Sequence, residues 1–380
     1  MNFLVFLFFS ITLIYKNADA KDMNIDPNGY IVFCPCMGRF GNQMDQFLGA
    51  LAFAKGIERT LVLPHLVEYP DRFSSSVQIP FQTYFKVEPL NEYTKVVLMD
   101  DFMKYIAPKV WPKGNRTVFC YMGRGDSKDC SAKDGNPFGP YWNNFGIDFD
   151  NDVFYGPLGY DPTFGNHKVG WMTKYSPEKY PVLAFTGAPG AFPVLEKHVF
   201  LQKYLKWSDF IDSKAEEFIN KLTGGSHEKF IGIHLRNGVD FKRACEHVKT
   251  SKSNFFASPQ CLGYHQENGE MTEELCYPSE KTIFKQLDKV LKKYDAQYVF
   301  IATDAEDMLV KLSKKFKHVK FIKYPENNPH VDICILGKAD HTIVNCVSSF
   351  SAFIKRQRDS ENKTTEFWGF KAKKKIEQEL

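Results

Sequence analysis

The sequence predicts an α/β protein of two Rossmann-like domains that face a common cleft. Strand-like and helix-like segments alternate in the second half of the chain, as in parallel-sheet proteins. A strand, a glycine-rich turn and a helix follow one another near the start, as in nucleotide-binding units. With 380 residues, the chain is too long for one core, which favours two domains.

The first of these elements is a strand at residues 30–34, followed by the turn Gly38-Arg39-Phe40-Gly41-Asn42-Gln43. Apolar residues then recur at helical spacing to about Lys55, which predicts an amphipathic helix. Such a unit points backbone N–H groups at an anion. It lacks the G-x-x-x-x-G-K-[ST] pattern of a P-loop, and a pair of glycines by itself often marks only a tight turn. Arg39 and Asn42 favour the binding interpretation.

The remainder of the N-terminal half contains fewer regular signals. Apolar runs predict strands at residues 60–63, 95–99 and 181–185. Residues 106–180 are rich in Gly, Pro, Asn and Asp with little periodicity, and we expect long ordered loops there. A helix is expected over residues 208–222 and ends at Gly224-Gly225, which we take as the domain boundary.

The second half alternates more regularly. We expect strands at residues 230–234, 298–303, 319–322 and 342–345, and helices at 281–294, 306–316 and 351–358. The apolar segment 331–336 fits either a helix or a strand.

Polar residues cluster where two of these strands end. His234, Arg236 and Asp240 follow the strand that begins at Phe230, and a guanidinium there suits a diphosphate. Asp240 could orient Arg236 or bind a ligand hydroxyl, although a surface Arg–Asp pair would give the same pattern. Ser348-Ser349 lies at a second strand-to-helix turn, which suits a phosphate, simple N-capping, or both.

Several segments indicate a lumenal protein. Residues 3–15 are almost wholly apolar and precede an A-x-A pattern at residues 18–20, so residues 1–20 are predicted to be a signal peptide. The tail Glu377-Gln378-Glu379-Leu380 resembles an endoplasmic reticulum (ER) retrieval signal, and Asn115 and Asn362 begin N-glycosylation sequons. We therefore expect the ER lumen, with no membrane span. The net charge of +4 does not indicate a nucleic-acid partner.

The chain contains nine cysteines, so at least one is free or linked to another chain. In an oxidising lumen most should form disulfides. Cys334 lies in an apolar stretch and is the expected buried thiol, whereas Cys34 and Cys36 are expected to form a local disulfide.

Four motifs carry a resemblance to a known family. GRFGNQ (38–43), HLRNGVD (234–240), ATD (302–304) and VDICILGKADHTIVNCVSSFSAF (331–353) are similar to segments of the GDP-fucose protein O-fucosyltransferases. The resemblance runs through nearly the whole mature chain. It implies a GT-B glycosyltransferase with GDP-fucose in the cleft, inversion at the fucose anomeric carbon, and Ser or Thr acceptors in folded EGF-like domains such as those of Notch-type receptors.

The resemblance also implies roles for particular residues. Arg236 and Asn42 are the expected catalytic residues, and Asp332 is the expected reader of guanine. The full set of expected GDP-fucose contacts is Arg39, Phe40, Gly41, Asn42, His234, Arg236, Asp240, Asp332, Ser348, Ser349 and Phe350. The implied disulfides are Cys34–Cys36, Cys120–Cys130, Cys245–Cys276 and Cys261–Cys346, with the last two pairings open to exchange.

The implied organisation is an acceptor-side domain at residues 21–224, with residues 359–380 packing back on it, and a GDP-fucose-binding domain at 225–358. GDP-fucose is a substrate, so no cofactor is expected, and the resemblance suggests a monomer. Asp148-Phe149-Asp150 resembles a metal-binding D-x-D motif, but it lies in an Asn/Asp-rich run typical of a solvated loop, so no metal site is expected.

The sequence shows no convincing general base for the acceptor hydroxyl. We therefore favour a dissociative path, in which the leaving phosphate or Asn42 assists. Two other functions remain open: a non-catalytic ER lectin or chaperone for EGF-like domains, and an O-fucosyltransferase for thrombospondin-type repeats.

Overall fold

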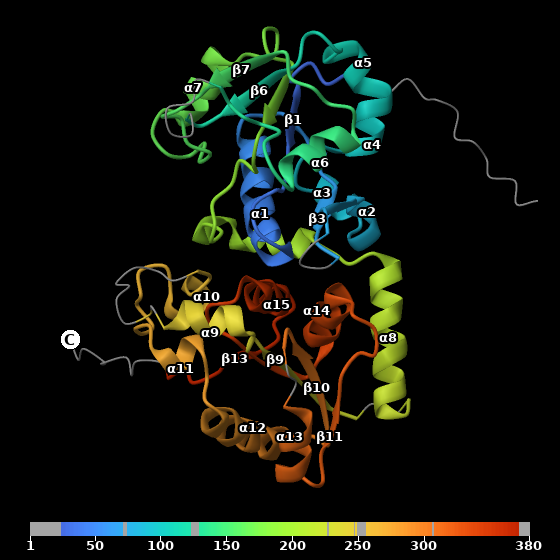
Figure 1. The fold of residues 1–380 in the computed structure, drawn as a ribbon, viewed down its shortest axis with the longest axis vertical. Helices are drawn as coiled ribbons and strands as arrows, with labels where there is room; N and C mark the ends of the chain where they lie inside the picture. Colours follow the sequence, from blue (N-terminus) through green and yellow to red (C-terminus); the bar gives the residue numbers. More distant parts are fainter. Residues whose placement is uncertain are drawn as a thin grey trace, which may run out of the picture.

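The computed structural model describes residues 24–70, 74–122, 129–225, 228–246, 248, 256–305 and 308–371. The described chain forms two halves, each built on a parallel sheet, that lie one above the other (Figure 1). The expected signal peptide and the C-terminal tetrapeptide lie outside the described residues. Within them, no helix combines the length and apolar character needed to cross a membrane.

The N-terminal half contains a six-stranded sheet. Its strands are β1 (Tyr30–Phe33), β2 (Thr60–Leu63), β5 (Val96–Leu98), β6 (Thr117–Cys120), β7 (Asn151–Phe154) and β8 (Val182–Phe185). They lie in the order β5-β2-β1-β8-β6-β7, and every pairing is parallel. A two-stranded antiparallel ribbon of β3 (Leu66–Glu68) and β4 (Val77–Ile79) lies outside this sheet.

Helices cover both faces of this sheet. The longest is α1 (Phe40–Gly56), whose apolar side packs with alternate residues of β1 such as Ile31 and Phe33. Tyr30 and Val32 point to the other face, which packs against Phe102 and other apolar residues. The remaining elements here are α2 (Phe81–Tyr84), α3 (Glu88–Asn91), α4 (Met99–Asp101), the π-helix η1 (Phe102–Ile106), α5 (Ala107–Val110), α6 (Phe138–Asn144), α7 (His167–Lys174) and the 3-10 helix η2 (Glu196–Tyr204).

The C-terminal half contains a five-stranded parallel sheet. Its strands are β9 (Phe230–Leu235), β10 (Tyr298–Thr303), β11 (Lys320–Ile322), β12 (His341–Val344) and β13 (Thr365–Phe367), in the order β11-β10-β9-β12-β13. Strands alternate with helices, so the predicted Rossmann-like pattern is confirmed.

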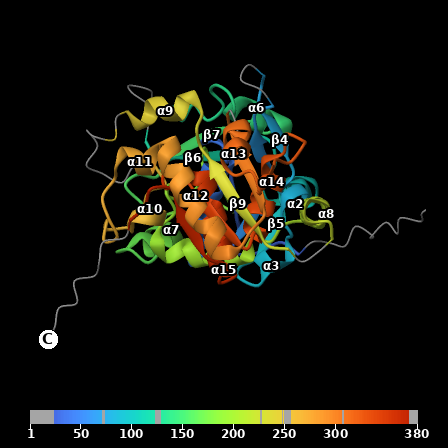
Figure 2. The same cartoon turned by 90° about the horizontal axis from the view of Figure 1, so that it is seen from below.

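The helices of this half are α8 (Asp209–Thr223), α9 (Val239–Cys245), α10 (Pro259–Leu262), α11 (Glu273–Cys276), α12 (Glu280–Tyr294), α13 (Leu309–Lys315), α14 (Pro329–Lys338) and α15 (Ser349–Ser360). The view from below places α12 and α13 in front of the sheet (Figure 2). Ile231 and Ile233 of β9 share a core with α12, whereas Phe230 of the opposite face shares one with α14 and α15.

One sequence expectation differs from the structure, and one that was left open is decided by it. Residues 106–180 were expected to be loops, yet β6 and β7 lie there and extend the sheet beside β8. Both are short strands in a stretch rich in Gly, Pro, Asn and Asp, and β7 itself begins with Asn151 and Asp152, so no clear apolar run marks them. The open segment 331–336 is helical: it belongs to α14 and is buried between α8, α15 and the sheet, so its apolar residues do not reveal a helical period.

The boundary expected at residue 224 also differs. Helix α8 precedes that position but packs on α14 of the C-terminal half, where Lys338 Nζ lies 2.9 Å from carboxylate oxygens of both Asp212 and Glu216 (Figure 1). The chain therefore leaves the N-terminal half before α8, near Ser208. Gly224 ends the helix in a left-handed conformation and marks a helix terminus rather than a domain edge.

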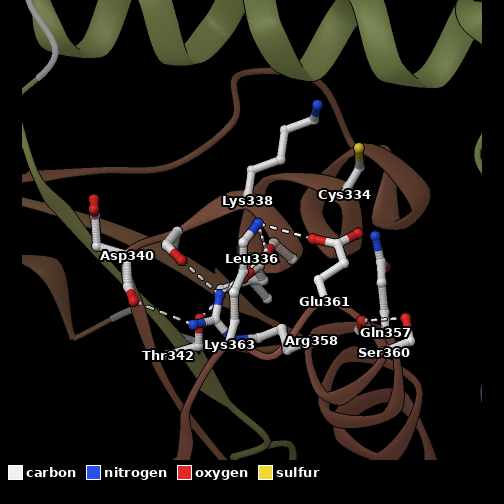
Figure 3. Close-up of polar contacts among 12 residues, drawn as sticks. Cys334, Leu336, Lys338, Asp340, Thr342, Gln357, Arg358, Ser360, Glu361 and Lys363 are labelled. Atoms are coloured by element: carbon white, nitrogen blue, oxygen red, sulfur yellow. Dashed lines mark hydrogen bonds and ion pairs between the residues drawn. The ribbon is translucent and has the colours of Figure 1, made fainter.

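The described part of segment 359–380 was expected to pack on the N-terminal half, and this is wrong. Strand β13 pairs with β12 instead, at the edge of the C-terminal sheet. The buried Arg358 guanidinium explains the docking, because it donates to the carbonyls of Ala339 at 2.6 Å and Thr364 at 2.8 Å. It also donates to the carbonyl of Asp340 at 3.3 Å (Figure 3). These bonds join the C-terminal end of α14 to the chain entering β13.

The two halves meet where α1 lies against α15 (Figure 1). Asp45 of α1 and Arg356 of α15 form a buried ion pair with an O–N distance of 2.5 Å, and their side chains are 1% and 5% exposed. Arg356 Nε also donates to Gln202 Oε1 at 3.1 Å. The ion pair joins residues 311 positions apart and fixes one half against the other.

Removing one partner of this pair should destabilise the fold. We expect Arg356→Met to lower the free energy of unfolding by about 3–5 kcal/mol, because Asp45 is left buried and unpaired. Urea denaturation measures this change, and adding Asp45→Asn should recover most of the loss. Lys221→Met, which breaks an exposed pair with Glu217, is the matched control and should have no measurable effect. Equal stability of the Arg356 and Lys221 variants would contradict the assignment.

Candidate active site

The predicted site residues lie at the carboxyl ends of parallel strands, at the junction of the two halves. Asn42 follows β1 through the turn that begins α1, Arg236 follows β9, and Ser348 follows β12. Ligands of open α/β sheets bind at this edge. We use the name "junction site" for Gly41, Asn42, His234, Arg236, Ser349 and Phe350.

Two helix N-termini meet in the junction site. A Cβ built on Gly41 would lie 2.6 Å from Ser349 Oγ and 2.7 Å from the backbone nitrogen of Phe350, so the first turn of α1 nearly touches that of α15. Ser349 Oγ donates to Asn42 Oδ1 at 2.6 Å across the same contact. Because the N-terminus of a helix carries partial positive charge, two adjacent N-termini favour an anion between or beside them.

Arg236 is held in a fixed orientation at the carboxyl end of β9, the strand that pairs with β12. Its Nη2 donates to Asp240 Oδ2 at 2.9 Å, and its Nη1 forms an ion pair with Asp304. The guanidinium carbon lies 4.6 Å from the centroid of the Phe241 ring. The bond from Arg236 lowers the pKa of Asp240, so this carboxylate is ionised at neutral pH.

Gly238 makes room for this cluster. A Cβ at Gly238 would lie 2.6 Å from carboxylate oxygens of both Asp240 and Asp304 and 3.1 Å from Arg236 Nη1. Asp304 also accepts from the backbone N–H of Asn237 at 3.0 Å. The turn after β9 is therefore folded around the guanidinium.

His234 lies under the other side of the junction site. It is 3% exposed, its ring centroid is 4.7 Å from that of Phe350, and its Nδ1 is 2.7 Å from Ser351 Oγ. Burial, and then the positive charge of Arg236, lower the pKa of His234 to about 3. The imidazole is therefore neutral at physiological pH.

Asp332 lies in the first turn of α14 and is largely buried. The described residues provide no hydrogen-bond partner for its carboxylate, and burial raises the pKa of Asp332 to about 7, an effect that Lys323 opposes. A recessed carboxylate without a protein partner suits a ligand that presents N–H donors.

The remaining expected contacts differ in character. Arg39 is exposed, with its guanidinium carbon 5.7 Å from the centroid of Tyr69. The Phe40 ring contacts protein rather than open space: His330 at 4.6 Å and Phe353 at 5.2 Å, centroid to centroid. Only the backbone N–H of Phe40, at the start of α1, is then suited to a ligand. Ser348 occupies the N-cap position of α15 but makes no side-chain cap bond; it is buried, and its N–H donates to Asn345 Oδ1 at 3.1 Å.

The site also includes residues to which the sequence assigned no role. Asp304 orients Arg236, although the sequence analysis noted it only as the last residue of the ATD motif. Asn345 accepts from the backbone N–H groups of Val347 and Ser348 and so shapes the turn before α15. Glu68 accepts from Tyr84 at 2.5 Å and is 2.6 Å from His330 Nε2, joining β3 to α14 beside Phe40.

The described residues contain no group of three or more His, Cys, Asp or Glu that could hold a metal ion. In the D-x-D-like segment, Asp148 pairs with Lys133 at 2.5 Å and Asp150 accepts from the backbone N–H of Arg116 at 2.8 Å. Both carboxylates therefore have structural partners.

The four expected disulfides are confirmed. Cys34–Cys36, Cys120–Cys130, Cys245–Cys276 and Cys261–Cys346 are paired, and Cys334 is a free, buried thiol. Cys261–Cys346 fastens the turn that precedes α15. Asn115 and Asn362, which begin the two sequons, are both exposed.

Together, the two parallel sheets and the anion-suited junction between them have the architecture of the GT-B glycosyltransferases. Comparison with known proteins narrows this class. The family model of GDP-fucose protein O-fucosyltransferase matches residues 30–361. GDP-fucose protein O-fucosyltransferase 1 of Caenorhabditis elegans is 40% identical over 372 residues, which cover 94% of each chain.

Solved structures agree with this result. A crystal structure of POFUT1 in complex with GDP-fucose superposes with a TM-score of 0.87 at 40% identity, covering 91% of this chain and 99% of that one. One in complex with GDP has a TM-score of 0.85 at 41% identity, with 91% and 100% covered. The chain belongs to the GDP-fucose protein O-fucosyltransferase family.

The close approach at Gly41 leads to a testable prediction. We expect Gly41→Ala to lower the free energy of unfolding by about 1–3 kcal/mol, because the new Cβ meets backbone atoms of α15 that cannot move independently. GDP affinity should fall as well, since both helix ends shift. Gly269→Ala is the control, because its Cβ would make only ordinary contacts at 3.6 and 3.7 Å. Calorimetric titration with GDP and urea denaturation give the two readouts, and wild-type values for Gly41→Ala would refute the prediction.

Proposed function

We propose that this chain transfers fucose from GDP-fucose to a Ser or Thr hydroxyl of folded EGF-like domains, with inversion at the anomeric carbon. The observation that carries the proposal is the close approach of two helix N-termini at the sheet edge where Arg236 follows β9, the strand that pairs with β12. Family membership supports the donor, and the relative named GDP-fucose protein O-fucosyltransferase 1 supports transfer to protein.

The diphosphate accounts for the geometry of the junction site. Negative charge grows on GDP as the fucosyl–phosphate bond breaks, and preorganised donors aimed at that charge lower the barrier. Arg236 is preorganised by Asp240 and Asp304, so little reorganisation is needed when the charge develops. The first turns of α1 and α15 supply backbone N–H groups around the same position.

Two further roles complete the proposed donor site. Asp332 accepts hydrogen bonds from the N–H edge of guanine, which suits its unpartnered carboxylate. Asn42 lies beside the diphosphate and helps to orient the acceptor, with its amide oxygen held by Ser349. Arg39, His234, Ser348, Ser349 and Phe350 are the other proposed contacts, together with the backbone of Phe40 and Gly41.

Three described carboxylates near the junction are already paired with other side chains, which argues against each of them as the general base. Asp240 and Asp304 pair with Arg236, and Glu68 is engaged by Tyr84 and His330. We therefore propose that the reaction follows a dissociative path, in which the leaving phosphate or Asn42 assists the acceptor hydroxyl. We also propose that the enzyme works as a monomer in the ER lumen, without a metal or cofactor.

The test is transfer of labelled fucose from GDP-fucose to a folded EGF-like domain, with the same domain reduced and unfolded in parallel. We expect transfer to the folded domain only, and a loss of about 100- to 1,000-fold in Arg236→Ala. Arg243→Ala, an exposed arginine on α9, should retain activity. Binding of the folded domain without any transfer would instead indicate a non-catalytic lectin or chaperone.

The raised pKa of Asp332 predicts how donor binding depends on pH. Guanine N–H groups require an ionised acceptor, so below about pH 7 a proton must leave Asp332 before GDP binds. GDP affinity should therefore fall by up to about tenfold for each pH unit below 7. Calorimetric titration from pH 8 to pH 5.5 measures this slope. Asp332→Asn should bind more weakly and lose that part of the pH dependence; an unchanged slope would exclude Asp332 as the guanine contact.

A further inference from the structure

Ser351, which contacts the proposed donor contact His234, lies just outside the set of proposed donor contacts. Ser351 belongs to the first turn of α15 and its side chain is 0% exposed, so it cannot reach a ligand at the junction. Its Oγ lies 2.7 Å from Nδ1 of His234. The imidazole ring is also held by the Phe350 ring, with centroids 4.7 Å apart.

The hydrogen-bond partners of Ser351 indicate where the imidazole proton lies. A serine hydroxyl has one hydrogen to donate and two lone pairs. The backbone N–H of Asn345 donates to Ser351 Oγ at 3.0 Å, which occupies one lone pair. Among the described residues, Nδ1 is the one recorded acceptor for the hydroxyl hydrogen.

It follows that Nδ1 accepts and that the proton of the neutral ring is on Nε2. Burial and Arg236 disfavour a second proton, as the low pKa of His234 indicates. The described residues offer no hydrogen-bond partner to Nε2. A nearly buried N–H beside Arg236 and the first turn of α15 is thus left for a ligand.

We propose that Ser351 is a positioning residue that holds His234 in the Nε2–H tautomer, so that this N–H donates to an acceptor oxygen of the bound nucleotide. The identity of the ligand in this inference rests on the proposed donor site. The assignment of the tautomer does not depend on that site. Ser351 acts only through His234 and touches no substrate.

The first test measures the tautomer without any ligand. Protein labelled with ¹⁵N-histidine gives separate pyridine-type and pyrrole-type ring resonances, and His234→Gln identifies the signals of His234 by removing them. We expect a pyridine-type Nδ1 and a pyrrole-type Nε2 in the wild-type protein, and mixed tautomers in Ser351→Ala. A protonated Nδ1 in the wild-type protein would overturn the proposal directly, whether or not the variant folds.

The second test measures the consequence for the nucleotide. Calorimetric titration with GDP should show about tenfold weaker binding in Ser351→Ala, the size expected for one poorly placed hydrogen bond. GMP distinguishes the acceptor: equal weakening for both nucleotides places the oxygen in the nucleoside or its first phosphate, and weakening for GDP alone places it in the terminal phosphate. Unchanged binding of both nucleotides would overturn the role of Ser351.

Two further variants separate positioning from stability. Ser360→Ala, in the same helix, removes a hydroxyl that donates only to the backbone of Gln357 and should leave GDP binding unchanged. Ser351→Thr retains the hydroxyl and should restore the wild-type tautomer and most of the affinity.

In steady-state transfer, Ser351→Ala should raise the KM for GDP-fucose more than it lowers kcat. Failure of the wild-type protein to bind GDP would count against the proposed donor site and leave the tautomer measurement valid.

Discussion

The junction between the two halves depends on the close contact of α1 with α15. Asp45 and Arg356 form an ion pair that water barely reaches, and Gly41 lets the two helices approach until their first turns meet. Without this contact, each half would present one ordinary helix N-terminus at the edge of its sheet. With it, two such ends act on the same position, which suits the diphosphate of the proposed donor.

The contact also explains why most of the charged side chains discussed near the junction are paired with other protein groups. Charges placed at the junction must be compensated before a ligand arrives, because burying an unpaired charge is costly. Arg236 is compensated by two carboxylates, and His234 remains neutral in its buried position. Asp332 is the exception among the acids discussed here, since it has no recorded partner and its pKa is raised instead. A group left in this condition is a reasonable place for substrate recognition.

Much of the fold and site could be predicted before the structure. Strands β2 and β10 have the predicted residues, and the strand after which Arg236 lies was expected within one residue of its end. Long apolar runs bounded by turns carry that information locally. The short strands β6 and β7 were missed because the stretch around them is rich in Gly, Pro, Asn and Asp, and β7 itself begins with Asn151 and Asp152. Their assignment depends on the neighbouring strand that they pair with.

The sequence by itself determined which residue types stand at the ends of the strands, and the family resemblance then grouped Asn42, Arg236 and Ser349 into one site. It also determined the number of cysteines and the amphipathic faces of the helices. Only the tertiary structure decided that α8 and β13 belong to the C-terminal half, that Asp304 orients Arg236, and that Ser351 contacts His234. The physical reason is distance along the chain. Contacts such as Asp304 with Arg236 join separate segments, and the local sequence pattern of one segment does not indicate which other segment it will contact.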